Sequence, residues 1–410
     1  MSQRIKKCRI SNSNDLIKVI SLGEQYLTGV FPKSRDEAIS KGPLNLLWCK
    51  KSNLLQLSHS YPLDEMYGDN YGYRSGLNGS MVNHLTNKAR FLESFCDLKA
   101  YDLVVDIGSN DATLLKSYKS KNLIRVGIDP TGEKFQKFYT GGIDLIPEFF
   151  PSVSFLKKYY NKKVKLITSI AMFYDLESPG SFVKSIYEIL ADDGVWHFEQ
   201  SYMPAMLRTN SYDTICHEHL EYYSLGVVND LLNQFSLQII DVQFNDINGG
   251  SFAVTASKTS SSFKPNQSVI DWLLYQEEKM QLNTPLPYKI FEKKVYQHRE
   301  DITNLINRLN NDGKTIIGYG ASTKGNVLLQ FCDLSENEIP FIAEVNEDKY
   351  GCFTPGSKIP IIPEKDAREM EPDYFLILPW HFKNGILAKE REFISRGGKF
   401  IVPLPEIQII

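Results

Sequence analysis

Residues 104–113 read VVDIGSNDAT, and this stretch decides which fold the middle of the chain adopts. It begins with a short apolar run of the kind that forms a buried strand, and Gly108 then allows a tight turn into a helix expected from Thr113. Backbone N–H groups in such a turn can approach a ligand at the carboxyl edge of a parallel sheet. The next expected strand, residues 124–129, ends in Asp129, whose carboxylate can accept hydrogen bonds from both hydroxyls of a ribose.

This turn also indicates which cofactor it serves. A dinucleotide site typically reads G-x-G-x-x-G, whereas this turn has one glycine and carries Ala112 where another is expected. It is more similar to the S-adenosylmethionine loop of class I methyltransferases, a cofactor that has no pyrophosphate to bind. An ordinary α/β turn, with Asp129 capping a helix, is the alternative. The cofactor hypothesis names as candidate contacts Asp106, Gly108, Asn110, Asp129, Phe150 and Ser169.

Length and composition predict a globular protein of two or three domains. The chain has 410 residues, of which 42% are apolar and 23% charged. A net charge of −3 gives no general attraction to nucleic acid or to an anionic membrane. No stretch approaches the about 20 apolar residues of a membrane helix, and the N-terminus lacks the apolar core of a signal peptide. Six scattered cysteines favour a reducing cytoplasm over a disulfide framework.

Strands alternate with helical segments from about Tyr101, which predicts a doubly wound parallel α/β sheet. A second strand–turn–helix pattern starts at Thr315 and predicts a smaller C-terminal α/β domain. Strands are expected at 103–106, 124–129, 164–169, 194–199, 315–318, 340–345 and 373–378, a helix at 182–190, and a hairpin at 44–49 and 53–57. Four segments follow: a small N-terminal module (1–75), a cofactor-binding domain (76–262), a helical linker (263–310) and a C-terminal Rossmann-like domain (311–410).

Residues 216–223 read CHEHLEYY and crowd together side chains that exchange protons, including two of the seven histidines. Such a concentration is typical of a site for general acid–base catalysis. A histidine with only a structural role on an interface loop is the alternative for His219. A metal site built from Cys216, His217 and His219 is disfavoured, because neighbouring side chains diverge and no second pair of ligands lies nearby in the sequence.

Six motifs in this order resemble a family, the sugar C-methyltransferases that act on nucleotide-linked 4-keto-6-deoxyhexoses. The resemblance extends over nearly the whole chain. The motifs are LGEQYL at 22–27, YGYRS at 71–75, HEHLEYY at 217–223, NGGS at 248–251, GYGASTKGN at 318–326 and PGSKIP at 355–360. The resemblance implies an N-terminal zinc-binding module, a central class I methyltransferase domain and a C-terminal Rossmann-like domain.

The resemblance also implies that His219 is the general base and that Glu218 acts beside it. A ketone at C4 of the sugar acidifies the proton on C3, and a histidine that is mostly neutral at pH 7 can remove it to form an enolate. We expect Tyr73, Tyr222 or Tyr223 to donate a hydrogen bond to the enolate oxygen. Each of these three competes with a packing role, because the chain contains 22 tyrosines.

The candidate substrate contacts are Arg74, Ser75, Tyr223, Asn248 and Lys324, on a TDP- or GDP-linked sugar. Lys324 is expected to meet the diphosphate, with a surface lysine beside a glycine turn as the alternative. An O- or N-methyltransferase acting on a sugar nucleotide would need no carbon acid. A sugar-nucleotide-binding protein without catalysis is a further alternative. No nucleic acid or membrane partner is expected.

The chain departs from the family pattern in the zinc module and near the base. The family's module typically has two C-x-x-C pairs, but here the pairs begin with Cys8 and Cys49, and Ser11 and Ser52 replace the second cysteine of each pair. Because serine is a poor zinc ligand, zinc binding is doubtful. Cys216 occupies a position where some relatives carry tyrosine, and residues 170–175 contain no histidine. These differences point to a different branch of substrates.

Overall fold

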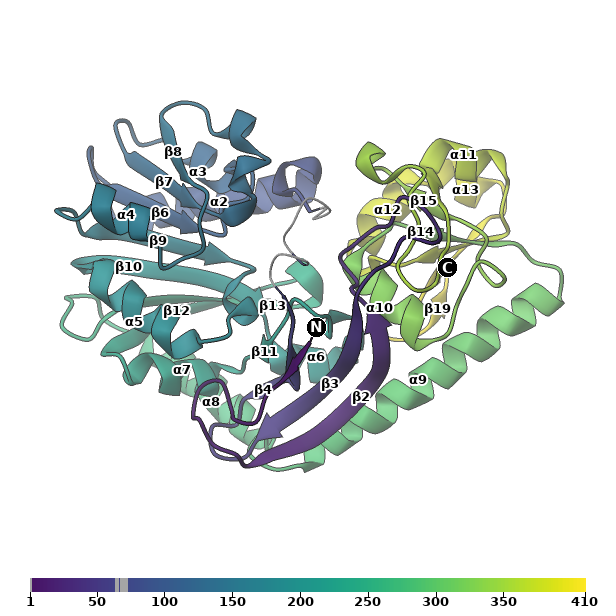
Figure 1. Ribbon diagram of the computed structural model, residues 1–410, viewed down its shortest axis with the longest axis horizontal. Helices are drawn as coiled ribbons and strands as arrows, with labels where there is room; N and C mark the ends of the chain where they lie inside the picture. Colours follow the sequence, from purple (N-terminus) through teal and green to yellow (C-terminus); the bar gives the residue numbers. More distant parts are fainter. Residues whose placement is uncertain (1, 63–65, 67–72) are drawn as a thin grey trace.

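The computed structural model describes residues 2–62, 66 and 73–410, which include four β-sheets. In Figure 1 the largest sheet lies on the left, a smaller C-terminal sheet lies on the right, and the purple N-terminal strands cross between them. Two positions of the expected YGYRS motif, Tyr71 and Gly72, lie outside the described residues. In the described part of the chain, no helix has the length and apolar character that a membrane span requires.

The seven-stranded sheet confirms the predicted doubly wound α/β class. Its order is β12-β13-β10-β9-β6-β7-β8, and β13 is antiparallel to both of its neighbours while the other pairings are parallel. One reversed strand next to the sheet edge is the arrangement of class I methyltransferases. The strands are β6 (Leu103–Ile107), β7 (Ile124–Ile128), β8 (Ile143–Ile146), β9 (Val164–Ile170), β10 (Leu190–Ser201), β12 (Leu237–Asn245) and β13 (Ser251–Lys258).

Helices cover both faces of this sheet, and the two hydrophobic cores that they form with it share residues of the central strand β6. Every residue of β6 is buried, as expected for a parallel strand packed on both sides. Helix α2 starts after Asn78, whose side chain accepts a hydrogen bond from the N–H of Ser80 at 2.9 Å. The helices are α2 (Gly79–Phe95), α3 (Thr113–Ser117), α4 (Val153–Lys158), α5 (Pro179–Ile189), α6 (Met203–Thr209) and α7 (Leu225–Asn233).

The C-terminal sheet repeats the strand–turn–helix plan. Its order is β16-β15-β14-β17-β18-β19, with only β19 antiparallel to its neighbour. The Ser322 side chain caps α10 by accepting from the N–H of Gly325 at 3.0 Å. The elements are β14 (Ile316–Tyr319), α10 (Thr323–Phe331), β15 (Ile342–Glu344), β16 (Ile361–Pro363), α11 (Glu364–Glu369), β17 (Tyr374–Ile377), α12 (Lys383–Lys389), α13 (Arg391–Ser395), β18 (Lys399–Val402) and β19 (Gln408–Ile409).

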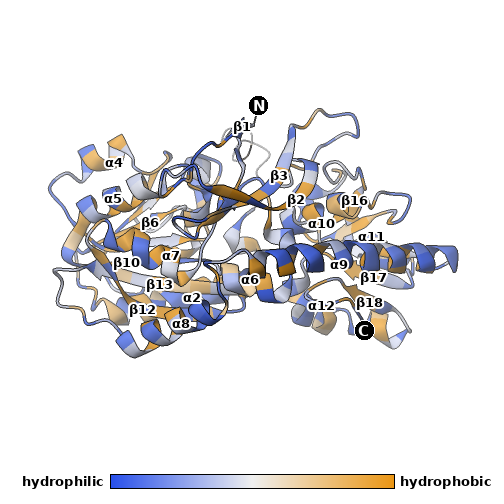
Figure 2. Ribbon diagram, turned by 90° about the horizontal axis from the view of Figure 1, so that it is seen from below, coloured by the Kyte–Doolittle hydropathy of each residue, from blue (hydrophilic) through white to orange (hydrophobic). Residues whose placement is uncertain are grey.

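Two helices connect these sheets, as the charged, helix-favouring sequence of the linker predicts. They are α8 (Gln267–Lys279) and α9 (Leu286–Asn311). The buried positions of α9 recur every three or four residues, so one stripe of the helix faces the protein. Figure 2 shows the same helix with alternating orange and blue bands.

The N-terminal sheet contains two strands that the sequence did not reveal. The expected hairpin is present as β3 (Lys41–Cys49) and β4 (Leu55–Leu57), but β2 (Leu16–Tyr26) was not anticipated. The sheet order is β11-β4-β3-β2, and β11 (Glu221–Tyr222) comes from the CHEHLEYY segment. A two-stranded sheet pairs β1 (Gln3–Arg4) with β5 (His59–Ser60). The N-terminal sheet therefore includes residues that lie far beyond position 75.

Thiol–hydroxyl pairs occupy the place where the two C-x-x-C pairs typical of the family would hold zinc. Cys8 Sγ lies 3.2 Å from Ser52 Oγ, and Ser11 Oγ lies 3.5 Å from Cys49 Sγ. The two C-x-x-S turns therefore meet each other through one thiol and one hydroxyl each. Within the described residues, no group of three or more His, Cys, Asp or Glu side chains could hold a metal ion. This donor set does not fit zinc, which favours thiolate and imidazole ligands.

We predict that the wild-type protein contains much less than one zinc per chain and that EDTA leaves its thermal unfolding midpoint unchanged. The Ser11→Cys/Ser52→Cys variant restores four thiols at the same turns and is expected to bind zinc stoichiometrically. Elemental analysis and thermal unfolding with and without chelator check both results. Stoichiometric zinc in the wild type would contradict the assignment.

Candidate functional site

A cavity of about 1210 Å³ lies between the carboxyl edge of the seven-stranded sheet and the turn before α10. The N-terminal module contributes Gly29 to its wall, and the C-terminal domain contributes Ser322 and Lys324. Pockets for one small molecule usually measure about 300–1,000 Å³. The cavity is therefore large enough for a cofactor and a substrate side by side.

At one end of this cavity, Asp129 fastens the glycine turn. Its Oδ2 accepts from the N–H of Asn110 at 2.7 Å, and its Oδ1 accepts from the N–H and hydroxyl of Thr131, each at 2.7 Å. Gly108 has a φ of +76°, a conformation that favours glycine. The carboxylate is nearly buried but lines the cavity, and Oδ2 keeps a lone pair for a ligand.

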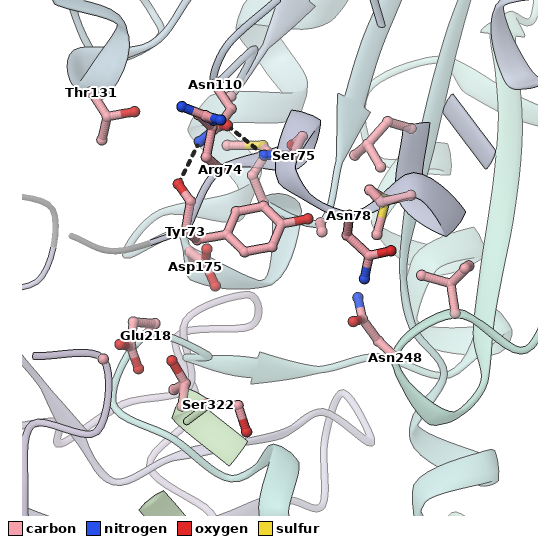
Figure 3. A pocket seen from close by; sticks show the side chains of 18 of the residues that line it. Tyr73, Arg74, Ser75, Asn78, Asn110, Thr131, Asp175, Glu218, Asn248 and Ser322 are labelled. Carbon is pink, nitrogen blue, oxygen red and sulfur yellow. Dashed lines mark hydrogen bonds between the residues drawn. The ribbon is translucent and has the colours of Figure 1, made fainter. Parts of the chain in front are cut away.

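The segment 73–75 is held over the same turn by the Asn110 side chain. The Asn110 amide donates to the carbonyl of Tyr73 at 3.2 Å and accepts from the N–H of Ser75 at 3.0 Å (Figure 3). The Tyr73 ring extends into the cavity in this view, and 48% of its surface is exposed. One wall of the cavity therefore contains both the cofactor turn and the predicted residues Tyr73, Arg74 and Ser75, which come from a separate motif earlier in the chain.

Asp106 and Phe150 also line this end of the cavity. Asp106 is buried and accepts a hydrogen bond from the Thr168 hydroxyl at 2.6 Å. Burial raises the pKa of Asp106 to about 7 despite this hydrogen bond, so its carboxyl is partly protonated at neutral pH. The ring of Phe150 packs edge-on against Phe182, with centroids 5.1 Å apart.

His219 lines the cavity, and one of its ring nitrogens forms a hydrogen bond with the backbone. Its Nδ1 lies 2.9 Å from the carbonyl oxygen of Thr214, so Nδ1 carries the proton and donates it in this hydrogen bond. The lone pair of the neutral ring then resides on Nε2. Burial, followed by the charge of Lys324, lowers the pKa of His219 to about 4. The ring is consequently neutral at pH 7 and able to accept a proton.

Glu218 lies next to this histidine and reaches toward the N-terminal module. A Cβ on Gly29 would overlap Oε1 of Glu218, so glycine at position 29 leaves room for the carboxyl group. Burial raises the pKa of Glu218 above its ordinary value. Within the described residues its Oε2 has no hydrogen-bond partner. In Figure 3 Glu218 lies on the same side of the cavity as Ser322 of the C-terminal domain.

The predicted substrate contacts Arg74, Asn248 and Lys324 lie on different walls of the cavity. The Arg74 guanidinium lies 4.9 Å from the centroid of Phe138 and 3.9 Å from Asp111. Lys324 Nζ donates to the backbone carbonyl of Asn248 at 2.6 Å, which joins the two larger domains. Figure 3 shows the Asn78 and Asn248 side chains directed toward one another across the cavity.

Three predicted residues do not line the cavity, and the candidate set is corrected accordingly. Ser169 is fully buried and accepts from the Trp196 indole at 3.1 Å. Tyr223 is also fully buried and stacks on Phe173, with centroids 5.2 Å apart. The Tyr222 hydroxyl donates to the carbonyl of Thr214 at 3.4 Å, beside a much smaller pocket. These side chains are core groups because the strand ends that carry them pack under the site.

Several cavity residues were missed by the sequence analysis. Gly29, Gln200 and His381 gave no local signal, because their segments contain no recognisable motif. Glu344 could have been found by the reasoning used for Asp129, since it ends the strand after a glycine turn. Its Oε2 accepts from the N–H of Ala321 at 2.7 Å. The C-terminal domain therefore has a second glycine turn that is held by the carboxylate at the end of the next strand.

The sheet order, the glycine turn and the acid at the end of β7 define a class I methyltransferase. Family models match residues 246–405 as "C-methyltransferase C-terminal domain" and residues 8–67 as "Putative zinc binding domain". The chain is 31% identical over 409 residues to the C-methyltransferase NovU of Streptomyces niveus, covering 99% of this chain and 97% of that protein. The chain belongs to this C-methyltransferase family.

Solved structures match a smaller part of the chain. An S-adenosylmethionine-dependent methyltransferase of Clostridium acetobutylicum is 11% identical, with a TM-score of 0.33 over 43% of this chain and 92% of that one. Magnesium protoporphyrin IX methyltransferase of Synechocystis, solved with its cofactor bound, is 10% identical, with a TM-score of 0.32 over 43% of this chain and 79% of that one.

The protein is therefore an enzyme that methylates carbon, with S-adenosylmethionine as its methyl donor. The residues of the cavity fit this cofactor. Gly108 leaves the backbone open at the turn, and Asp129 offers an acceptor where a ribose would lie. Phe150 and Met172 add apolar side chains to the wall at the same end of the cavity.

We predict that Asp129→Ala weakens binding of S-adenosylmethionine about tenfold or more. A hydrogen bond to a charged group contributes about 1.5–3 kcal/mol, and the loosened turn adds to the loss. Isothermal titration calorimetry measures the affinity. Asp102→Ala is the matched control, because Asp102 lies outside the cavity and bonds to the N–H of Lys99. Equal affinities for wild type and Asp129→Ala would remove Asp129 from the cofactor site.

Proposed function

We propose that this enzyme methylates C3 of a nucleotide-diphosphate 4-keto-6-deoxyhexose, TDP- or GDP-linked, through an enolate formed by His219. The observation that carries the proposal is the orientation of His219. Its Nδ1–H is held by the Thr214 carbonyl, which leaves the Nε2 lone pair available in a cavity that also contains the cofactor turn. A carbon nucleophile needs such a base, since the C3 proton must leave before a C–C bond can form.

Different residues of the cavity carry out different parts of this reaction. His219 takes the C3 proton, and the electron pair of that bond moves toward the C4 oxygen. Tyr73, which projects into the cavity, is the candidate donor to that oxygen, and Glu218 stabilises the protonated state of the network. Bound S-adenosylmethionine supplies an electrophilic methyl group. Positioning of the two reactants in one enclosed volume accounts for much of the acceleration.

The substrate half of the cavity suits a sugar nucleotide in size and polarity. Arg74 and Ser75 face it from the wall above the cofactor turn, and Asn248 faces it from the loop before β13. The Ser322 cap and the first turn of α10 present backbone N–H groups at another wall. A cytoplasmic location, where nucleotide sugars are made, completes the proposal.

We predict that His219→Asn lowers methylation of the keto sugar by about 10²–10⁴-fold and leaves cofactor binding intact. Product mass spectrometry and NMR of the product locate the added methyl on C3. The wild type should also exchange the C3 proton with deuterium from solvent. His217→Asn is the comparison, since His217 belongs to the same motif but packs edge-on against Tyr61, 4.7 Å between centroids, outside the cavity.

A methyl group on oxygen or nitrogen would contradict the proposal, because neither product requires loss of the C3 proton. Retention of full methylation by His219→Asn would remove this histidine as the base. Thermal unfolding of both variants shows whether a loss of activity reflects loss of the fold.

The pH dependence offers a separate expectation. Because the pKa of His219 is lowered to about 4, the neutral base persists as the pH falls through 6.5, where an ordinary histidine would be half protonated. We predict that kcat/KM shows no loss with a midpoint near pH 6.5 and that its acid limb lies below about pH 5. Circular dichroism at each pH separates protonation of the base from unfolding. An acid limb centred at 6.5 would contradict the neutral, desolvated histidine.

A further inference from the structure

Lys324 is a buried cation from the C-terminal domain that lies within the cavity. It occupies the first turn of α10, and only 9% of its surface is exposed. Its Nζ donates to the carbonyl of Asn248 at 2.6 Å, in the loop between β12 and β13 of the methyltransferase sheet. The salt bridges found among the described residues do not include Lys324. One neutral carbonyl therefore holds an ammonium group that has further N–H donors.

The other cations of the cavity have carboxylates or a different location. Lys389 forms an ion pair with Glu364, and Arg74 lies 3.9 Å from Asp111 beside the cofactor turn. Lys349 donates to the carbonyl of Ala321, and its charge is supported first by Glu344. Burial lowers the pKa of both Lys349 and Lys324, but the carboxyl that supports the charge of Lys324, Asp213, already accepts from the Trp380 indole at 2.8 Å.

Lys324 and His219 line the same cavity. The charge of Lys324 is the second largest cause, after burial, of the lowered pKa of His219. The same charge acts on His381, another cavity residue. Within the enolate, the carbon that loses its proton and the carbon that bears the oxygen are direct neighbours. A cation that stabilises the oxygen must therefore lie in the same cavity as the base, as Lys324 does.

Resting on the proposed function, we propose that Lys324 binds the C4 oxygen of the keto sugar and stabilises its negative charge during enolisation, instead of binding the diphosphate. His219 Nε2 takes the proton, and the C3–H electron pair becomes the C3=C4 bond. The π pair of the ketone moves to the oxygen, which accepts from the Lys324 ammonium. When C3 then bonds to the methyl group, the C4=O bond reforms and the electron pair of the S–CH₃ bond remains on sulfur.

This assignment makes the C-terminal domain part of the chemistry. Because the ammonium is buried and weakly compensated before substrate binds, its attraction for a developing anion is strong. The hydrogen bond to Asn248 fixes its position in advance. Lys324 is thus a catalytic residue supplied from across the domain boundary, whereas Tyr73 approaches from the cofactor wall.

The test distinguishes a contact between Lys324 and the C4 oxygen from a contact between Lys324 and the diphosphate. Enolisation is measured alone, as deuterium exchange at C3 by NMR in D₂O, with saturating keto sugar and with S-adenosylhomocysteine in place of the methyl donor. Affinity for the free nucleoside diphosphates TDP and GDP is measured by calorimetry. The variants are Lys324→Met and Lys324→Gln, of which the second keeps a donor for Asn248 but lacks the charge. Lys383→Met is the control, because Lys383 is a half-buried lysine of the same domain that does not line the cavity.

We expect both Lys324 variants to slow saturated exchange by about 10²–10³-fold, as loss of one oxyanion donor does elsewhere. Affinity for the nucleoside diphosphate should stay within about twofold, and Lys383→Met should match the wild type in both measurements. A tenfold loss of diphosphate affinity with unchanged saturated exchange would overturn the proposal in favour of a diphosphate contact. Unchanged values in both measurements would overturn it in favour of a packing role.

The wild type distinguishes failure of this proposal from failure of the proposed function. Exchange and methylation by the wild type, with no loss in the Lys324 variants, reject only the role of Lys324. Absence of both reactions in the wild type rejects the keto-sugar function and this role with it. Thermal unfolding shows whether Lys324→Met folds. If it does not, the measurement is made with Lys324→Gln.

Discussion

The site depends on the pairing of β11 with β4, which attaches the segment carrying the base to the N-terminal sheet. The N–H of Leu57 donates to the carbonyl of Leu220 at 2.8 Å, and Glu221 and Tyr222 continue the pairing with Gln56 and Leu55. At the opposite edge of that sheet, the chain around β2 meets α10, where the Asn326 amide donates to the carbonyl of Thr28 at 2.7 Å. One sheet therefore contacts both the loop of His219 and the helix of Lys324, which fixes the base and the cation relative to each other.

Arg9 reinforces this connection and gives the N-terminal module a role that requires no metal. Its guanidinium donates to the carbonyl of Leu57 at 2.8 Å and to that of His59 at 3.2 Å, and it lies 3.5 Å from the Glu221 carboxyl. Both side chains are buried, and Arg9 also lies 3.6 Å from the Glu177 carboxyl. Arg9 belongs to the first C-x-x-S turn. The module thus retains a position under the catalytic loop although two of its expected zinc ligands are serines.

Burial controls the electrostatics of the site in a consistent direction. It lowers the pKa of His219 and of Lys324 and raises that of Glu218. In the same enclosed volume, a developing oxyanion would interact strongly with the nearby donors. Enclosure requires all three parts of the chain, because the cavity is lined by Gly29, by the methyltransferase sheet edge and by the first turn of α10.

The sequence by itself determined the α/β class, most of the central strands and the glycine turn with Asp129 at the end of the next strand, because these follow from local periodicity and short motifs. It missed both β2 and β11, because strand pairing depends on partners far away in the chain. Tertiary structure alone decided that Ser169, Tyr222 and Tyr223 pack in the core, since the accessibility of a polar group depends on what covers it. It also decided that Lys324 and His219 line one cavity, a relation between residues more than a hundred positions apart that no local pattern encodes.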